Sequence, residues 1–85
     1  MSPTNPFHHL VDTFRLSRTE LAAGLGVPYG TFSDVLDGKK PAPASLLEAV
    51  ESLGYDAEEF RREYSVWRAW RREQAHTTKT LAGVA

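Results

Sequence analysis

The segment from Ser17 to Leu36 constrains the fold more than any other part of this chain, because it holds two short helical patterns only a few residues apart. Ser17 and Glu20 have the spacing of a capping box. In this motif, at the start of a helix, each side chain accepts a hydrogen bond from the backbone amide of the other residue. Gly24 and Gly26 then end that helix, and after Val27 and Pro28 a second one begins at Tyr29. Two helices joined by so short a turn have to pack directly against each other.

The residues inside this segment meet the steric demands of such a helix pair. Ala22 is small, as the closest approach of two helices requires, and Gly26 can adopt the positive φ that the turn needs. The positions that would be buried between the two helices are all apolar, namely Leu21, Leu25, Val27, Phe32 and Val35. The spacing therefore predicts a helix-turn-helix, with helices over residues 18–25 and 29–36.

Apolar residues at intervals of three and four predict three further helices, over residues 6–15, 44–53 and 57–74. Their apolar faces would consist of Phe7, Leu10, Val11 and Phe14 in the first, Leu46, Leu47, Val50 and Leu53 in the fourth, and Phe60, Tyr64 and Trp67 in the fifth. No alternating strand pattern appears in the sequence. We therefore expect an all-α, compact five-helix domain over residues 6–74, with an N-terminal arm at 1–5 and a flexible tail at 75–85.

Composition and charge narrow the class of protein. The 85 residues, of which 41% are hydrophobic, suffice for one domain, and no apolar run approaches the ~20 residues of a membrane span. The sequence has no cysteine and no basic stretch leading into an apolar one, so we expect a cytoplasmic, nucleoid-associated protein. The net charge is −1, but residues 64–85 carry four basic residues against one acidic residue. The C-terminal part is therefore locally basic, as binding to phosphate would require.

Short motifs in the same region carry a resemblance to a known family. They are Glu-Leu-Ala at 20–22, Leu-Gly-Val at 25–27, Thr-Phe-Ser at 31–33, Gly-Lys-Lys at 38–40 and Leu-Gly at 53–54. Over residues 7–64, about two thirds of the chain, the sequence resembles the Cro and C-type phage repressors, also called the xenobiotic-response-element family. The resemblance implies a lambda-repressor-like fold and a DNA-binding transcriptional regulator, a Cro-like repressor that binds a pseudo-palindromic operator on double-stranded DNA as a dimer.

In this family the third helix enters the major groove while the second crosses the DNA backbone. Matched position by position, the resemblance assigns base-edge contacts to Tyr29, Gly30, Ser33 and Asp34. It assigns phosphate contacts to Ser17, Arg18, Pro28, Thr31, Lys39 and Lys40. None of the four base-edge residues is an arginine, lysine, glutamine or asparagine, the side chains that make bidentate contacts to purines. The sequence departs from the family in this respect, and base readout is expected to be weak or to reside elsewhere.

The fifth helix offers a surface for self-association. Phe60, Tyr64 and Trp67 are expected to fill the core, while Val66 and Trp70 lie on the shoulder of that apolar stripe. We expect a homodimer interface at Val66, Trp67 and Trp70. Such a dimer would place two recognition helices one helical turn of DNA apart, at ~34 Å.

Two alternatives keep the same scaffold. In one, the helix-turn-helix is a protein-interaction module, such as an adaptor or an antitoxin, with a protein partner and little or no base readout. In the other, a multimer binds DNA architecturally and without sequence preference. Enzyme activity, a cofactor and a metal site are not expected, because the sequence has no phosphate loop or nucleophile elbow and its three histidines lack ligand spacing.

Overall fold

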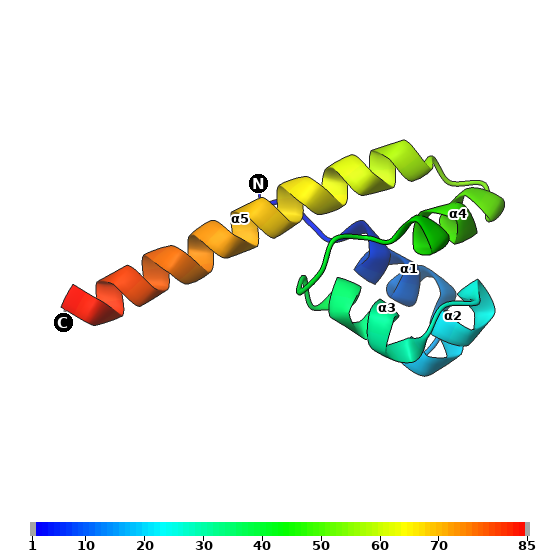
Figure 1. The fold of residues 1–85 in the computed structure, drawn as a ribbon, viewed down its shortest axis with the longest axis horizontal. Coiled ribbons are helices and arrows are strands. Elements are labelled where there is room, and N and C mark those ends of the chain that lie inside the picture. Colours follow the sequence, from blue (N-terminus) through cyan, green and yellow to red (C-terminus); the bar gives the residue numbers. More distant parts are fainter. Residues whose placement is uncertain (1, 85) are drawn as a thin grey trace.

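Five α-helices make up the fold (Figure 1), and the computed structural model describes the backbone of residues 2–84 and the side chains of residues 2–75. The helices are α1 (Pro6–Phe14), α2 (Arg18–Leu25), α3 (Tyr29–Leu36), α4 (Ala44–Ser52) and α5 (Ala57–Val84). No strand occurs between residues 2 and 84, so the all-α prediction is confirmed for this part of the chain. Within the same residues, no helix combines the length and the apolar character that crossing a membrane would need.

Local capping interactions explain where the first helices begin and end. The Asn5 side chain accepts a hydrogen bond of 2.9 Å from the Phe7 amide at the start of α1, and Arg15, at φ 54°, ends that helix. At α2 the capping box forms in both directions, with 3.1 Å from the Glu20 amide to Ser17 Oγ and 3.2 Å from the Ser17 amide to the Glu20 carboxylate. Gly26, at φ 73°, then ends α2 in the left-handed conformation that the sequence predicted.

One core is shared by all five helices, with α5 packed on α1 and α4 and with α2 packed on α3. The Phe7 ring meets the rings of Phe60 and Tyr64 edge to face, at centroid distances of 5.4 and 5.2 Å. Of the residues predicted to lie between α2 and α3, Leu21, Ala22, Val27, Phe32 and Val35 are buried and Leu25 is half-buried. These buried side chains fix α3 against α2 and leave its outer face open.

Two residues predicted to lie on buried faces are exposed instead. Phe14 is 41% exposed and Leu53 is 48% exposed, so those two predictions are wrong. Phe14 is the last residue of α1, and Leu53 is the C-cap of α4, each beyond the final turn that packs on the core. The helices end at Phe14 and Ser52, one residue earlier than the predicted 15 and 53, because Arg15 and Leu53 are the C-caps.

The fifth helix is longer than predicted. It continues to Val84 instead of ending near residue 74, so residues 75–84 are helical where the sequence predicted a flexible tail. Residues 75–82 contain neither glycine nor proline, so nothing in that stretch ends the helix. The second half of α5 projects beyond the other four helices, which makes the molecule 47 Å long and about half as wide (Figure 1).

Candidate nucleic-acid interface

The N-terminal end of α3 is open to solvent. Pro28, Tyr29 and Gly30 are exposed, with 51% of Tyr29 accessible, and no side chain caps the start of the helix. A Cβ added at Gly30 would meet nothing within 4 Å. Two of the four predicted base-edge residues, Tyr29 and Gly30, therefore lie on a free surface that a partner can approach.

The other two predicted base-edge residues already have partners within the chain. Ser33 is half-buried and its Oγ accepts a hydrogen bond of 3.2 Å from Arg18 Nη1. Asp34 is half-buried and its Oδ2 lies 3.1 Å from Lys40 Nζ. These contacts join a predicted base-edge residue to a predicted phosphate-contact residue in each case, so the predicted site is brought together in space.

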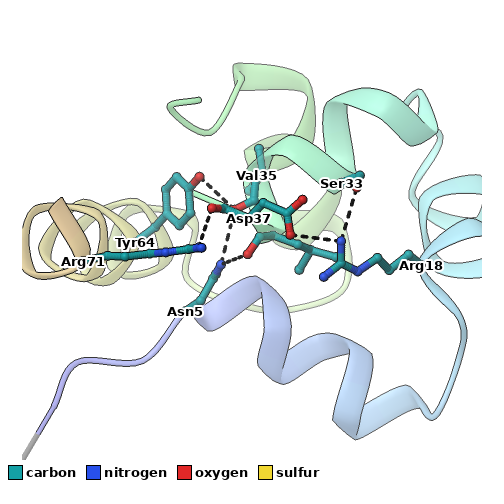
Figure 2. Close-up of polar contacts among 8 residues, drawn as sticks. Asn5, Arg18, Ser33, Val35, Asp37, Tyr64 and Arg71 are labelled. Atoms are coloured by element: carbon teal, nitrogen blue, oxygen red, sulfur yellow. Dashed lines mark hydrogen bonds and ion pairs between the residues drawn. The ribbon is translucent and has the colours of Figure 1, made fainter. Parts of the chain in front are cut away.

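Arg18 bridges α2 and the C-terminal end of α3 (Figure 2). Its Nη1 lies 3.1 Å from Asp37 Oδ1, and both side chains are about one third exposed, at 37% and 36%. A guanidinium has five N–H donors, and the contacts to Ser33 and Asp37 both use Nη1. Arg18 is therefore held in a fixed position, with its charge partly compensated by Asp37 and with donors left for a third acceptor.

The remaining predicted phosphate contacts lie around the same surface. Ser17 is exposed, but its hydroxyl oxygen already caps α2; Thr31 is half-buried on α3. Lys39 and Lys40 are exposed in the loop after α3. Lys40 pairs with Asp34 as described, whereas Lys39 forms no ion pair with any side chain of residues 2–75.

Sequence reasoning missed the contacts that hold the C-terminal end of α3, and Figure 2 draws those that Asn5 and Tyr64 make with Val35. The Asn5 amide nitrogen donates to the Val35 and Leu36 carbonyls at 3.3 and 3.2 Å. The Tyr64 hydroxyl donates toward the Val35 carbonyl at 2.9 Å and the Lys40 carbonyl at 2.6 Å. Each of these pairs spans more than twenty residues of sequence, so no local pattern could have indicated it.

Two arginines of α5 reach the same loop. Arg68 Nε donates to the Gly38 carbonyl at 3.2 Å, and Arg71 Nη1 donates to the Asp37 carbonyl. Cations at the C-terminal end of a helix interact favourably with its dipole and its unpaired carbonyls. Burial raises the pKa of the Tyr64 phenol to about 12, and the neighbouring charges of Arg68 and Arg71 oppose that rise. Tyr64 therefore stays a neutral hydrogen-bond donor at any physiological pH.

The predicted dimer residues on α5 differ in their surroundings. Val66 is 53% exposed, whereas Trp67 and Trp70 are half-buried. The Trp67 indole packs against Gly38, where an added Cβ would lie 2.8 Å from Trp67 Cζ3. Trp67 is therefore largely committed to the fold, and Val66 is the predicted dimer residue most available to a second chain.

Comparisons of the chain with protein-family models, with curated proteins and with solved structures found no match.

Proposed function

We propose that this protein is a sequence-specific DNA-binding transcriptional regulator, in which α2 and α3 form a helix-turn-helix and α3 enters the major groove. One observation carries the proposal. The buried residues between α2 and α3 fix the two helices against each other, while the N-cap Pro28 and the first two residues of α3, Tyr29 and Gly30, stay exposed. An open helix start on a rigid support is the geometry that base readout by a recognition helix needs.

Charges around α3 support the contact to the DNA backbone. Arg18 reaches from α2 to the C-terminal end of α3, and Lys39 and Lys40 lie in the loop that follows. Lysine and arginine make many of the phosphate contacts in protein–DNA complexes. Asp34 and Asp37 neutralise part of this charge through their pairs with Lys40 and Arg18. Affinity for arbitrary DNA should consequently be low, which favours a homodimer that doubles the number of contacts. The exposed Val66, together with Trp70, is the surface on which that dimer would form.

The test is a selection of bound duplexes from a random library at low salt, followed by anisotropy titration of the enriched duplex and a scrambled one. We expect an inverted repeat that binds at least ~100-fold more tightly than the scrambled duplex. Tyr29→Ala should lower affinity for the enriched duplex ~10-fold or more, because it removes a side chain from the exposed start of α3.

Leu53→Ala is the matched control, because Leu53 is 48% exposed, much like Tyr29 at 51%, but lies at the end of α4. It should leave both affinities unchanged. Base readout by α3 would be contradicted if no sequence were enriched, or if Tyr29→Ala and Leu53→Ala lowered the affinity for the enriched duplex equally.

The second candidate function is a protein-interaction module. It is favoured by the two ion pairs, since Arg18 and Lys40, both predicted to contact phosphate, already bind acidic side chains of the same chain. Under this alternative, a triple substitution of Arg18, Lys39 and Lys40 by alanine leaves the complex with the protein partner intact, whereas Tyr29→Ala disrupts it. Loss of the complex through the triple substitution alone would exclude this alternative.

A further inference from the structure

A basic cavity lies between the loop after α3 and the outer part of α5. Its volume is about 410 Å³. Four of the seven described residues that line it carry a positive charge: Lys39, Arg68, Arg71 and Arg72. The only acidic side chain among these seven is Asp37, whose carboxylate lies 3.1 Å from Arg18 on α2. The lining therefore has a strong excess of positive charge.

Two of the four cations are held in place by the fold. Arg68 donates through Nε to the Gly38 carbonyl at 3.2 Å, and its guanidinium lies 5.9 Å from the centre of the Tyr64 ring. Arg71 donates through Nη1 to the Asp37 carbonyl, and its guanidinium lies 5.2 Å from the centre of the Trp67 ring. Each arginine thus keeps N–H donors that the loop does not use. Because folding has already ordered these side chains, a ligand would not have to immobilise them on binding.

Arg68 and Arg71 have a structural role, but Lys39 and Arg72, the other two cations of the cavity, do not share it. Arg68 and Arg71 bind carbonyls at the end of α3, which stabilises the helix. Lys39 and Arg72 are exposed, and neither forms a hydrogen bond or an ion pair through its side chain within residues 2–75. Four like charges around one cavity repel one another, so an anion that enters it would relieve that repulsion.

We propose that this cavity binds a backbone phosphate of duplex DNA, so that α5 adds a contact outside the helix pair. The inference rests on the proposed function and deepens it. Guanidinium groups match the geometry of phosphate oxygens and lysine supplies a point charge, so the lining suits a phosphate diester. Asp37 also connects the cavity to the proposed DNA surface, because its carboxylate holds Arg18 while its carbonyl holds Arg71 (Figure 2).

The experiment measures the salt dependence of binding to the selected duplex and to a scrambled duplex, by anisotropy, at potassium chloride concentrations from low to moderately high. Arg72→Ala removes a lining cation that has no side-chain partner within residues 2–75 and that lies outside the contacts proposed around α3. It should weaken binding to both duplexes by the same factor, about 3-fold at the lowest salt. The log-log salt slope should also fall in magnitude by about 0.9 for each phosphate that the variant no longer neutralises.

Arg62→Ala is the charge-matched control, because Arg62 is also an exposed arginine of α5 but lines a different cavity, with Ser2, Pro3 and Thr4. It should leave the slope unchanged, and Arg72→Lys should retain most of the wild-type slope. Thermal unfolding of each variant checks that the fold is intact.

The outcomes separate the cavity from the proposed function. A wild-type slope in Arg72→Ala, with the wild type bound to DNA, would overturn the phosphate contact at the cavity while leaving the proposed function standing. Equal losses from Arg62→Ala and from Arg72→Ala would assign the effect to the general charge of α5 and overturn the cavity as well. A wild-type protein that binds no duplex even at the lowest salt would overturn the proposed function, and this inference with it.

Discussion

The two ends of α3 differ sharply in how they are held. At the N-terminal end, Tyr29 and Gly30 are exposed and no side chain caps the helix. At the C-terminal end, side chains from α2, from α5 and from the residue before α1 converge on the last carbonyls and on the loop that follows. The fold therefore anchors α3 by one end and presents the other.

This division separates the residues that stabilise the fold from the residues proposed to face the bases, along a single helix of eight residues. Substitutions at the anchored end should destabilise the protein, and substitutions at the presented end should leave it folded. Single substitutions at Gly38, Asn5, Tyr64 and Gly30 test that contrast.

Gly38→Ala should have the largest effect. Gly38 adopts φ 76°, which an alanine takes only with strain, and its new Cβ would lie 2.8 Å from the Trp67 ring. We expect a loss of about 3 kcal/mol in the free energy of unfolding, measured by urea denaturation.

Gly24→Ala is the matched control for Gly38→Ala, because a Cβ at Gly24 meets nothing within 4 Å and the residue lies inside α2. It should leave stability unchanged or raise it by about 0.5 kcal/mol. Equal stability of the two variants would show that the C-terminal end is not anchored through Gly38.

Asn5→Ala should cost about 2 kcal/mol, because the buried Asn5 side chain caps α1 through its oxygen and binds the Val35 and Leu36 carbonyls through its nitrogen. Alanine removes all three hydrogen bonds. Ser17→Ala, which removes only an exposed helix cap, should cost about 1 kcal/mol. If Asn5→Ala and Ser17→Ala lowered the free energy of unfolding equally, in thermal or urea denaturation, the contact of Asn5 with α3 would contribute nothing to stability.

The presented end of α3 could be predicted from sequence because its determinants are local. Ala22, Gly26 and the apolar positions of α2 and α3 lie close together in the sequence, and each acts through its own size or its own φ. The anchored end could not be predicted in the same way. Periodicity shows that Tyr64 lies on a buried face, but it does not show that its hydroxyl reaches a carbonyl 29 residues earlier.

The ion pairs of the candidate site also could not be predicted from the sequence. Counting residues identified Arg18 and Lys40 as cations near α3, yet their pairing with Asp37 and Asp34 depends on how the helix end and the following loop fold back. The grouping of Lys39 with the arginines of α5 likewise depends on how α5 packs against the loop. Exposure of side chains at helix ends, such as Phe14 and Leu53, escaped the pattern because periodicity treats every turn alike.

Tyr64→Phe should cost about 1.5 kcal/mol at neutral pH, because the Val35 and Lys40 carbonyls lose a donor. The folded state raises the pKa of Tyr64 from 10.0 to about 12, mainly through burial, so it binds the phenol proton more tightly than the unfolded chain does. This contribution to stability is complete below pH 10.0 and is lost as the pH rises through about 12.

The difference in unfolding free energy between wild type and Tyr64→Phe should therefore narrow in urea titrations as the pH rises from 10.0 toward about 12. Tyr55→Phe is the control, since the Tyr55 hydroxyl bonds to none of the residues 2–75, and it should change stability at neutral pH by less than about 0.5 kcal/mol. A difference that stays constant with pH would contradict the burial of a neutral phenol at the anchored end.

Gly30→Ala should have the smallest effect on stability and the opposite sign. Gly30 lies in the first turn of α3, and an added Cβ meets nothing within 4 Å, so alanine should stabilise the helix by about 0.5 kcal/mol. The same methyl group would stand on the surface proposed to face the bases, so affinity for the selected duplex should change although the fold is more stable. A glycine at each end of α3 thus gives a direct comparison, because Gly38→Ala should lower the free energy of unfolding while Gly30→Ala raises it. A loss of stability in Gly30→Ala would mean that the N-terminal end is packed, and that the division between an anchored end and a presented end is wrong.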